Sequence, residues 1–317
     1  MDIKRIDSQE ADVCKFIFSD ESAVFETVLY KYPDYETRTV ICCSTMSGCP
    51  VGCRFCGAGD YFVRNANADE IVMQVSYALS ETGVDPLKVK KLQVMFMSMG
   101  EPLLNKNGVI GACEMLYKRY PNAQLLLSSI GPKIDYMWLY KLSARIPTIG
   151  LQFSVHKTLD ETRNQLIPFE AKLTLKEIAE VGKKWKYITG GRKPYFNYCA
   201  GEDNSAQEDA ERLTELFPPD VWEATISVIC ESNDGMPTRN DRQRWLASDF
   251  SERVLRQGFT VRVFDPAGQD DIGGGCGQLW GTQAWMKDHP DKAKPSIGNG
   301  KPKVHMPEDV APTMDMY

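Results

Sequence analysis

Six of the ten cysteines in this 317-residue chain lie within the first 56 residues, and three of them form a compact cluster. Cys49, Cys53 and Cys56 follow a CxxxCxxC spacing within the segment CCSTMSGCPVGCRFCGAG. Glycines and a proline separate the cysteines, and such residues allow a loop to turn back so that three sulfur atoms face one point. Thiolates grouped in this way are typical ligands of a metal ion or an iron–sulfur cluster.

Three interpretations of this cluster compete. A structural zinc site needs a fourth ligand, which Cys42 or Cys43 could supply, but the second CxxC pair typical of such sites is missing. Three inert buried cysteines in a glycine-rich loop are a weaker explanation. A [4Fe–4S] cluster normally takes four thiolates, so three leave one iron open to another ligand. With Phe55 directly before Cys56, the pattern resembles the signature of the radical S-adenosylmethionine (SAM) superfamily, in which SAM occupies that iron.

Beyond the cluster, apolar strand-like runs alternate with amphipathic helical windows. We expect strands at 39–42, 92–98, 124–129, 149–155, 195–199, 224–230 and 259–264. We expect helices at 68–82, 107–118 and 134–143, within 158–186, and at 205–216 and 240–256. This alternation predicts a parallel sheet covered by helices, and the repeats are too few for a complete eight-fold barrel. The predicted fold is therefore an α/β partial, open (β/α)6 barrel.

Segments flank this predicted barrel on both sides. Residues 15–20 and 24–30 are expected to form a β-hairpin, so residues 1–36 are assigned to an N-terminal extension with that hairpin. Residues 37–280 form the predicted core domain. Residues 281–317 show no clear period and are expected to form an extended C-terminal tail.

Composition narrows the class of protein. No segment approaches the roughly 18 consecutive apolar residues of a membrane helix, and the first ten residues lack the apolar core of a signal peptide. We therefore expect a cytoplasmic protein without a membrane partner, whose cysteines serve as ligands, nucleophiles or buried apolar residues. The net charge of −6 disfavours a protein built chiefly to coat nucleic acid, although it does not exclude a local basic patch.

Further motifs resemble, in order, those of one family within the superfamily: the RlmN/Cfr-type radical SAM enzymes that methylate adenine in RNA. The similarity runs from about Lys15 to Leu279. The similar segments are YFVRNANADEI (61–71), MSMGEPLLN (97–105), LLLSSIG (125–131), FSVH (153–156), DETRNQLIP (160–168) and DDIGGGCGQL (270–279).

The resemblance implies two cofactors, SAM and a [4Fe–4S] cluster held by Cys49, Cys53 and Cys56. Glu101 follows an apolar strand, where its carboxylate can accept the SAM ammonium while Gly100 lets the backbone approach. Other implied SAM contacts follow strands at the ends where α/β barrels place ligands. They are Ser128, Ser154, Val155, His156 and, after the sixth strand, Asn233 or Ser232.

Three residues carry the chemistry specific to the family. By resemblance, Cys276 is the cysteine that SAM first methylates, Cys42 is the resolving cysteine seven residues before Cys49, and Glu26 is the proton acceptor. Carbon 2 of adenine lies between two ring nitrogens and is too electron-poor to attack a methyl cation equivalent. In the implied mechanism, a 5′-deoxyadenosyl radical takes hydrogen from the methyl group on Cys276, and the carbon radical adds to the base. Proton removal and attack by the Cys42 thiolate on the Cys276 sulfur then release the product and leave a disulfide.

Two departures from the family bear on the substrate. Only 14 residues precede the predicted hairpin, whereas family members usually carry an N-terminal domain that helps to hold RNA. The run VFDPAGQDD (263–271) contains aspartates where the family is typically basic, and phosphate contacts need lysine and arginine. Basic stretches interleaved with aromatics remain at 182–187 and 191–195.

We therefore expect a radical SAM methyltransferase acting on an electron-poor carbon, C2 or C8 of adenine in rRNA or tRNA. The alternative is the same methyl-cysteine chemistry on a smaller nucleotide-like or heteroaromatic substrate, on DNA or on a peptide. A non-catalytic iron–sulfur protein that binds RNA is disfavoured, because binding alone needs none of Cys42, Cys276 and Glu26. The expected protein partner is an electron donor such as flavodoxin or ferredoxin.

Overall fold

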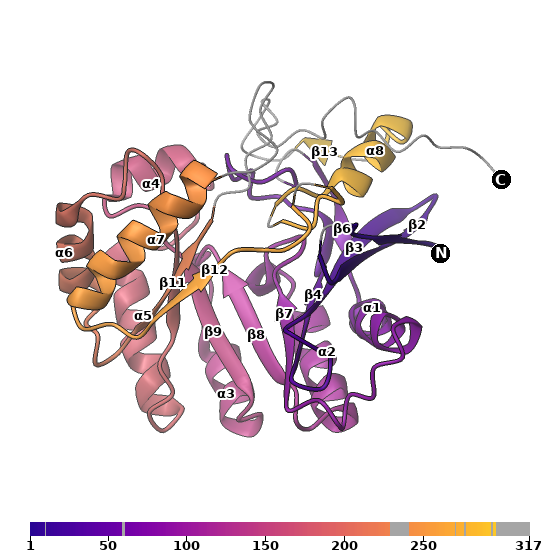
Figure 1. The fold of residues 1–317 in the computed structure, drawn as a ribbon, viewed down its shortest axis with the longest axis horizontal. Helices are drawn as coiled ribbons and strands as arrows, with labels where there is room; N and C mark the ends of the chain where they lie inside the picture. Colours follow the sequence, from indigo (N-terminus) through magenta and orange to yellow (C-terminus); the bar gives the residue numbers. More distant parts are fainter. Residues whose placement is uncertain are drawn as a thin grey trace.

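The computed structural model describes residues 1–9, 11–58, 61–228, 241–269, 271–275, 277–292 and 294–295. These residues form a mixed α/β structure with a ten-stranded sheet, a smaller three-stranded sheet and flanking helices (Figure 1). The strands of the large sheet are β1 (Asp2–Asp7), β2 (Val13–Asp20), β3 (Ala23–Lys31), β4 (Arg38–Cys43), β7 (Lys91–Phe96), β8 (Gln124–Ser129), β9 (Ile149–Ser154), β10 (Tyr195–Cys199), β11 (Glu223–Ser227) and β12 (Val261–Phe264). The small sheet contains β5 (Met46–Gly48), β6 (Tyr61–Asn65) and β13 (Lys294–Pro295).

Helices connect the parallel strands one after another. They are α1 (Ala68–Glu81), the 3-10 turn η1 (Pro102–Leu104), α2 (Lys106–Arg119), α3 (Met137–Arg145), α4 (Asp160–Leu166), α5 (Leu175–Ile188), α6 (Gln207–Leu216) and α7 (Asp241–Arg256). A further helix, α8 (Trp280–Asp288), follows the last parallel strand. Strand β4 and strands β7 to β12 pair in parallel, each joined to the next through at least one helix. The sheet does not close, because β1 and β12 are its two edges. The predicted α/β partial barrel is therefore confirmed.

Along each barrel strand, alternate side chains face the apolar core and the barrel interior. On β9, Leu151 and Phe153 pack in the main apolar core with the helices, whereas Gln152 and Ser154 line cavities inside the barrel. On β10, Phe196 belongs to the core in the same way. Because successive side chains of a strand point to opposite faces, the apolar residues hold the layers together and the polar ones are left for a site.

The predicted N-terminal hairpin is present as β2 and β3, and it continues the sheet beyond β4. Strand β2 pairs antiparallel with β3, and β3 pairs antiparallel with β4. In this register Val28 lies opposite Lys15 on one side and Cys42 on the other. Strand β1 adds a further antiparallel neighbour to β2, which the sequence analysis did not anticipate.

Helix α8 was also not anticipated, because residues 281–317 were expected to be an extended tail. It lies beside the hairpin (Figure 1), where the Trp285 indole donates a hydrogen bond to the Asp20 carbonyl at 3.1 Å. Trp280, Trp285 and Met286 are buried. A nine-residue helix gives a weak periodic signal and depends on such tertiary packing, which the sequence alone does not display. None of the described helices has the length and apolarity of a membrane span.

Candidate active site

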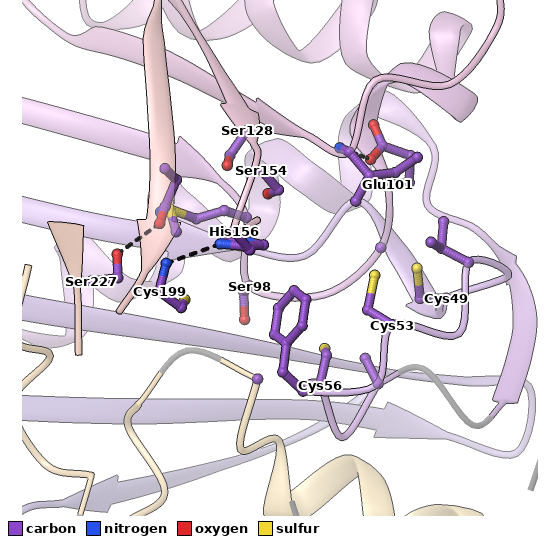
Figure 2. A pocket seen from close by; sticks show the side chains of 18 of the residues that line it. Cys49, Cys53, Cys56, Ser98, Glu101, Ser128, Ser154, His156, Cys199 and Ser227 are labelled. Atoms are coloured by element: carbon purple, nitrogen blue, oxygen red, sulfur yellow. Dashed lines mark hydrogen bonds between the residues drawn. The ribbon is translucent and has the colours of Figure 1, made fainter. Parts of the chain in front are cut away.

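A cavity lies where the carboxyl ends of the barrel strands meet the cysteine loop (Figure 2). The three predicted cluster cysteines and five of the predicted SAM contacts face it: Cys49, Cys53, Cys56, Gly100, Glu101, Ser128, Ser154 and His156. Val155 does not line this cavity; its side chain is buried and its N–H donates to the Asn197 carbonyl at 2.9 Å. Asn233, with its alternative Ser232, lies outside the described residues.

The three cysteine sulfur atoms point to the same side of their loop (Figure 2). Burial raises the pKa of the Cys49 and Cys53 thiols, so their thiolates need a nearby cationic group such as iron. Within the described part of the chain, no three cysteine, histidine or carboxylate groups are arranged to hold one metal ion. A single zinc ion requires such convergence, whereas a [4Fe–4S] cluster spreads its thiolates over separate irons. The three cysteines that line the cavity match the donor set of a [4Fe–4S] cluster that keeps one iron open.

Glu101 is almost completely buried beside these cysteines. Its Oε1 accepts a hydrogen bond from the Leu103 N–H at 2.9 Å, and its Oε2 accepts one from the Ile130 N–H at 2.8 Å. Burial nevertheless raises the pKa of this carboxyl to about 7. A carboxylate has about four lone-pair sites, so it retains capacity for a ligand ammonium, whose charge would favour the ionised form.

Gly100 gives Glu101 its close approach to the neighbouring segment. Its φ of +98° lies in the region that favours glycine, and a Cβ there would lie 2.6 Å from the Met46 Cβ and 2.8 Å from the Thr45 Oγ1. Any other residue would need to displace both neighbours.

His156 is neutral and has a defined tautomer. Its Nδ1 accepts a hydrogen bond from the Cys199 N–H at 3.1 Å, so Nε2 carries the proton. Burial, with the nearby Arg163 charge, lowers the pKa of His156 to about 3. The backbone has a positive φ of 59°, and the Asn204 amide holds the His156 carbonyl at 2.7 Å. His156 can therefore donate a hydrogen bond in the cavity but is not a proton acceptor at neutral pH.

Several cavity residues were missed by the sequence analysis. Ser98, Asn197, Cys199 and Ser227 line the cavity, and the Ser227 hydroxyl donates to Asn197 Oδ1 at 2.9 Å. The available signal was the two-residue alternation of the strands, which places Asn197 and Cys199 on the same face. Of the four residues only Ser98 lies in one of the family-like segments, MSMGEPLLN (97–105), and it was given no role there.

Arg163 was quoted within a motif but given no role. Its side chain is fully buried, and its Nη2 donates to the carbonyls of Ile130 at 2.7 Å and Ser154 at 3.0 Å. The guanidinium therefore fixes the ends of two barrel strands relative to each other beside the cavity.

A second, smaller cavity adjoins the first and contains Cys42. The two cavities share Met97, Ser98 and Gly277. Cys276 lies outside the described residues, but its neighbours Gly275 and Gly277 line this second cavity with Cys42. Gly273, Gly274, Gly275 and Gly277, here called the glycine segment, all line this cavity. The segment also contacts the cysteine loop, because the Gly57 N–H donates to the Gly277 carbonyl at 2.7 Å.

Glu26, the predicted proton acceptor, lines neither of these two cavities. It is fully buried, and its Oε1 accepts a hydrogen bond from the Thr282 N–H in the first turn of α8 at 2.6 Å. Its Oε2 lies 2.8 Å from the Nζ of Lys15, which is also buried. The sequence analysis did not foresee this ion pair.

Comparison with protein-family models gives no match. A protein from Fervidobacterium nodosum named probable dual-specificity RNA methyltransferase RlmN is 30% identical over 283 residues, which cover 88% of this chain and 78% of the relative. A protein of the same name from Thermosipho melanesiensis is 31% identical over 288 residues, with the same coverage. The chain belongs to the RlmN family. The family predicted from the motifs is thereby confirmed.

Solved structures show the radical SAM fold. A radical SAM methyltransferase from Sphaerobacter thermophilus superposes with a TM-score of 0.71 at 25% identity, covering 87% of this chain and 79% of that protein. Streptococcus suis SuiB bound to S-adenosylmethionine shares the fold alone, with a TM-score of 0.50 at 12% identity. This RlmN-family chain is a radical SAM methyltransferase, and membership in that superfamily implies SAM and an iron–sulfur cluster as cofactors.

Proposed function

We propose that this enzyme methylates C2 or C8 of adenine in RNA through a methylated Cys276. The relatives are named RNA methyltransferases, which supports RNA as the substrate class. The observation that carries the proposal is the pair of adjoining cavities. One contains the three cysteines and Glu101, and the other contains Cys42 and the neighbours of Cys276. In this proposal, cofactor cleavage takes place in the first cavity and the cysteine chemistry in the second.

In this proposal Cys49, Cys53 and Cys56 hold the [4Fe–4S] cluster. The bound cofactors supply two things, a methyl group from SAM and a hydrogen-abstracting radical from reductive SAM cleavage. Glu101 accepts the SAM ammonium, and the His156 Nε2–H donates a hydrogen bond to the same ligand. The hydroxyls of Ser128 and Ser154 provide further polar contacts on the barrel wall, with Asn233 as the expected contact after β11.

In this proposal Cys42 is the resolving thiol, and its place in the second cavity supports that role. It lies at the barrel strand β4 with little exposure, in a cavity whose other wall is the glycine segment on both sides of Cys276. Attack of the Cys42 thiolate on the Cys276 sulfur forms an S–S bond and breaks the S–C bond. The electron pair of the broken bond stays with the product carbon, which takes up one proton to become the methyl group, and a reductant must then restore both thiols.

The acidic run between β12 and the glycine segment is less repulsive to RNA than its sequence indicates. The Asp265 carboxylate pairs with the Arg244 guanidinium at 2.8 Å. The Asp271 carboxylate accepts hydrogen bonds from the Ser8 hydroxyl and the Gln9 N–H, both at 2.7 Å. These two aspartates therefore bind the protein itself, and their charges are partly compensated.

The test is an anaerobic reaction of cluster-loaded enzyme with SAM and a flavodoxin or ferredoxin reducing system, the donor we propose. Unmodified rRNA and tRNA transcripts are one set of substrates, and adenosine monophosphate is the other. Mass spectrometry of digested RNA should detect 2-methyladenosine or 8-methyladenosine with wild-type enzyme and neither with Cys276→Ala. Methylation of adenosine monophosphate but of no RNA would support the small-substrate alternative. An unmodified Cys276 in active enzyme would exclude the methyl-cysteine route.

A further inference from the structure

Lys15 is buried at a position where the charge of a lysine must be compensated by other groups. It lies on β2 between the core residues Cys14 and Phe16, and its side chain is 1% exposed. Burial of an ammonium is costly unless charges or hydrogen bonds compensate it. Two acceptors do so: Glu26 Oε2 at 2.8 Å and the Gly273 carbonyl at 2.5 Å.

Lys15 also lines the cavity that contains Cys42, whereas Glu26 does not. The lysine therefore stands between that cavity and the buried carboxylate. An ammonium has three N–H groups: one donates to the Gly273 carbonyl, and the nitrogen lies within ion-pair distance of Glu26 Oε2. Because Lys15 is also part of the cavity wall, its ammonium can serve both the cavity and the carboxylate.

The other groups with exchangeable protons in this cavity make hydrogen bonds of their own or have another proposed role. The Tyr30 hydroxyl donates to the Gly274 carbonyl at 2.5 Å, and the Ser98 hydroxyl donates to the Glu26 backbone carbonyl at 2.8 Å. Cys42 is the proposed nucleophile. Lys15 is the remaining ionisable group among the described residues of the cavity wall.

We propose that Lys15 is the proton relay between the substrate carbon and Glu26. This inference rests on the proposed function, because it assigns the route of the proton that must leave the methylated carbon. Lys15 takes that proton as it passes one of its own to Glu26 Oε2. The carbon–hydrogen bond breaks and its electron pair stays in the heterocycle, one N–H bond forms while another breaks, and an O–H bond forms on Glu26. Because radical addition leaves an unpaired electron on the adduct, the closed-shell product also requires the loss of one electron, for which a bound, oxidised [4Fe–4S] cluster would be the acceptor.

The hydrogen bond to Gly273 gives the relay a fixed position. Gly273 lies three residues before Cys276, so the same ammonium contacts the carboxylate and the backbone of the segment that carries the methylated cysteine. The Thr282 N–H holds the other carboxylate oxygen. These contacts hold Glu26, Lys15 and the glycine segment in fixed positions relative to one another.

The experiment compares Lys15→Met, Lys15→Arg and Lys15→Ala with wild-type enzyme, each loaded with its cluster. Intact-mass spectrometry measures methylation of Cys276, and nucleoside analysis measures methylated adenine and 5′-deoxyadenosine. Lys31→Met is the matched control, because Lys31 lies on the same hairpin and pairs with Asp12 at the surface. Circular dichroism and iron content verify the fold of each variant.

We expect Lys15→Met to methylate Cys276 at a near wild-type rate and to form methyladenosine at least about 100-fold more slowly, the usual contribution of proton-transfer catalysis. The ratio of 5′-deoxyadenosine to methyladenosine should rise. Methylamine should restore part of the activity of Lys15→Ala, and Lys31→Met should behave as wild type. Amine rescue separates a proton-transfer role from a structural one.

Should Lys15→Met fail to fold with an unpaired Glu26, the Lys15→Met/Glu26→Gln enzyme removes both charges and provides the test. Its methyladenosine rate should then equal that of Glu26→Gln alone, because both changes interrupt one relay. Normal methyladenosine formation by Lys15→Met, or equal loss of Cys276 methylation and adenine methylation without amine rescue, would overturn the relay. Absence of methyladenosine with wild-type enzyme would instead refute the proposed function.

Discussion

Breaking the Lys15–Glu26 pair should destabilise the enzyme strongly, and removing both charges together should not. The side chains are 1% and 0% exposed, and the charged atoms lie 2.8 Å apart. At an effective dielectric constant of about 20, this separation gives an attraction of about 6 kcal/mol, which offsets the cost of burying two charges. Lys15→Met leaves a buried carboxylate without its counter-charge, so we expect a loss of about 3–5 kcal/mol in the free energy of unfolding.

The double variant Lys15→Met/Glu26→Gln gives the internal control. It keeps side chains of similar size and leaves no buried charge, so we expect stability within about 1–2 kcal/mol of wild type. Urea unfolding of the cluster-loaded proteins, followed by circular dichroism, measures each value. Arg256→Met, which breaks the exposed Arg256–Glu252 pair, should have no measurable effect. Equal losses for the single and double variants would refute the reasoning, because the stability would then depend on packing rather than on charge.

Three further predictions concern the cofactor and cysteine sites. Burial raises the pKa of Glu101 to about 7, so its negative charge is lost as the pH falls through 7. The affinity for SAM, measured by calorimetry, should therefore drop about 30-fold from pH 8 to 5.5. An affinity that does not change with pH would contradict the proposed contact between Glu101 and the SAM ammonium. Gly100→Ala should weaken SAM binding at least about tenfold in the same assay, because its Cβ would clash with Met46; unchanged affinity would refute this. Cys42→Ala should methylate Cys276 and then accumulate a covalent enzyme–RNA adduct, visible on denaturing gels, whereas product without adduct would exclude Cys42 as the resolving thiol.

The fold and the cofactor cavity were largely predictable from sequence. Strand–helix alternation is a local signal, and it predicted the parallel strands and the helices between them. The motifs around Cys53, Glu101 and His156 end at strand termini, so they were expected to meet at one edge of the sheet. Among the described motif residues, all three indeed line one cavity.

What could not be predicted depends on contacts between distant segments. The Lys15–Glu26 pair requires the register of the hairpin, and the Glu26–Thr282 hydrogen bond joins residues 256 positions apart. Ser227 lies in the cavity only because of strand alternation, which an apolar run does not reveal. The positive φ of His156 likewise follows from the hydrogen bonds of Asn204 and Cys199 rather than from its own side chain.

The hydrogen bond between Glu26 and α8 has a consequence for the order of assembly. Synthesis proceeds from the N-terminus, so the hairpin, the cysteine loop and the barrel strands are all made before Thr282. Until then, Glu26 Oε1 lacks the N–H group that holds it, and the α8 N-terminus that favours its negative charge does not exist. A nascent chain that ends before α8 therefore carries all three proposed cluster ligands, but Glu26, the proposed proton acceptor, still lacks its hydrogen bond from Thr282.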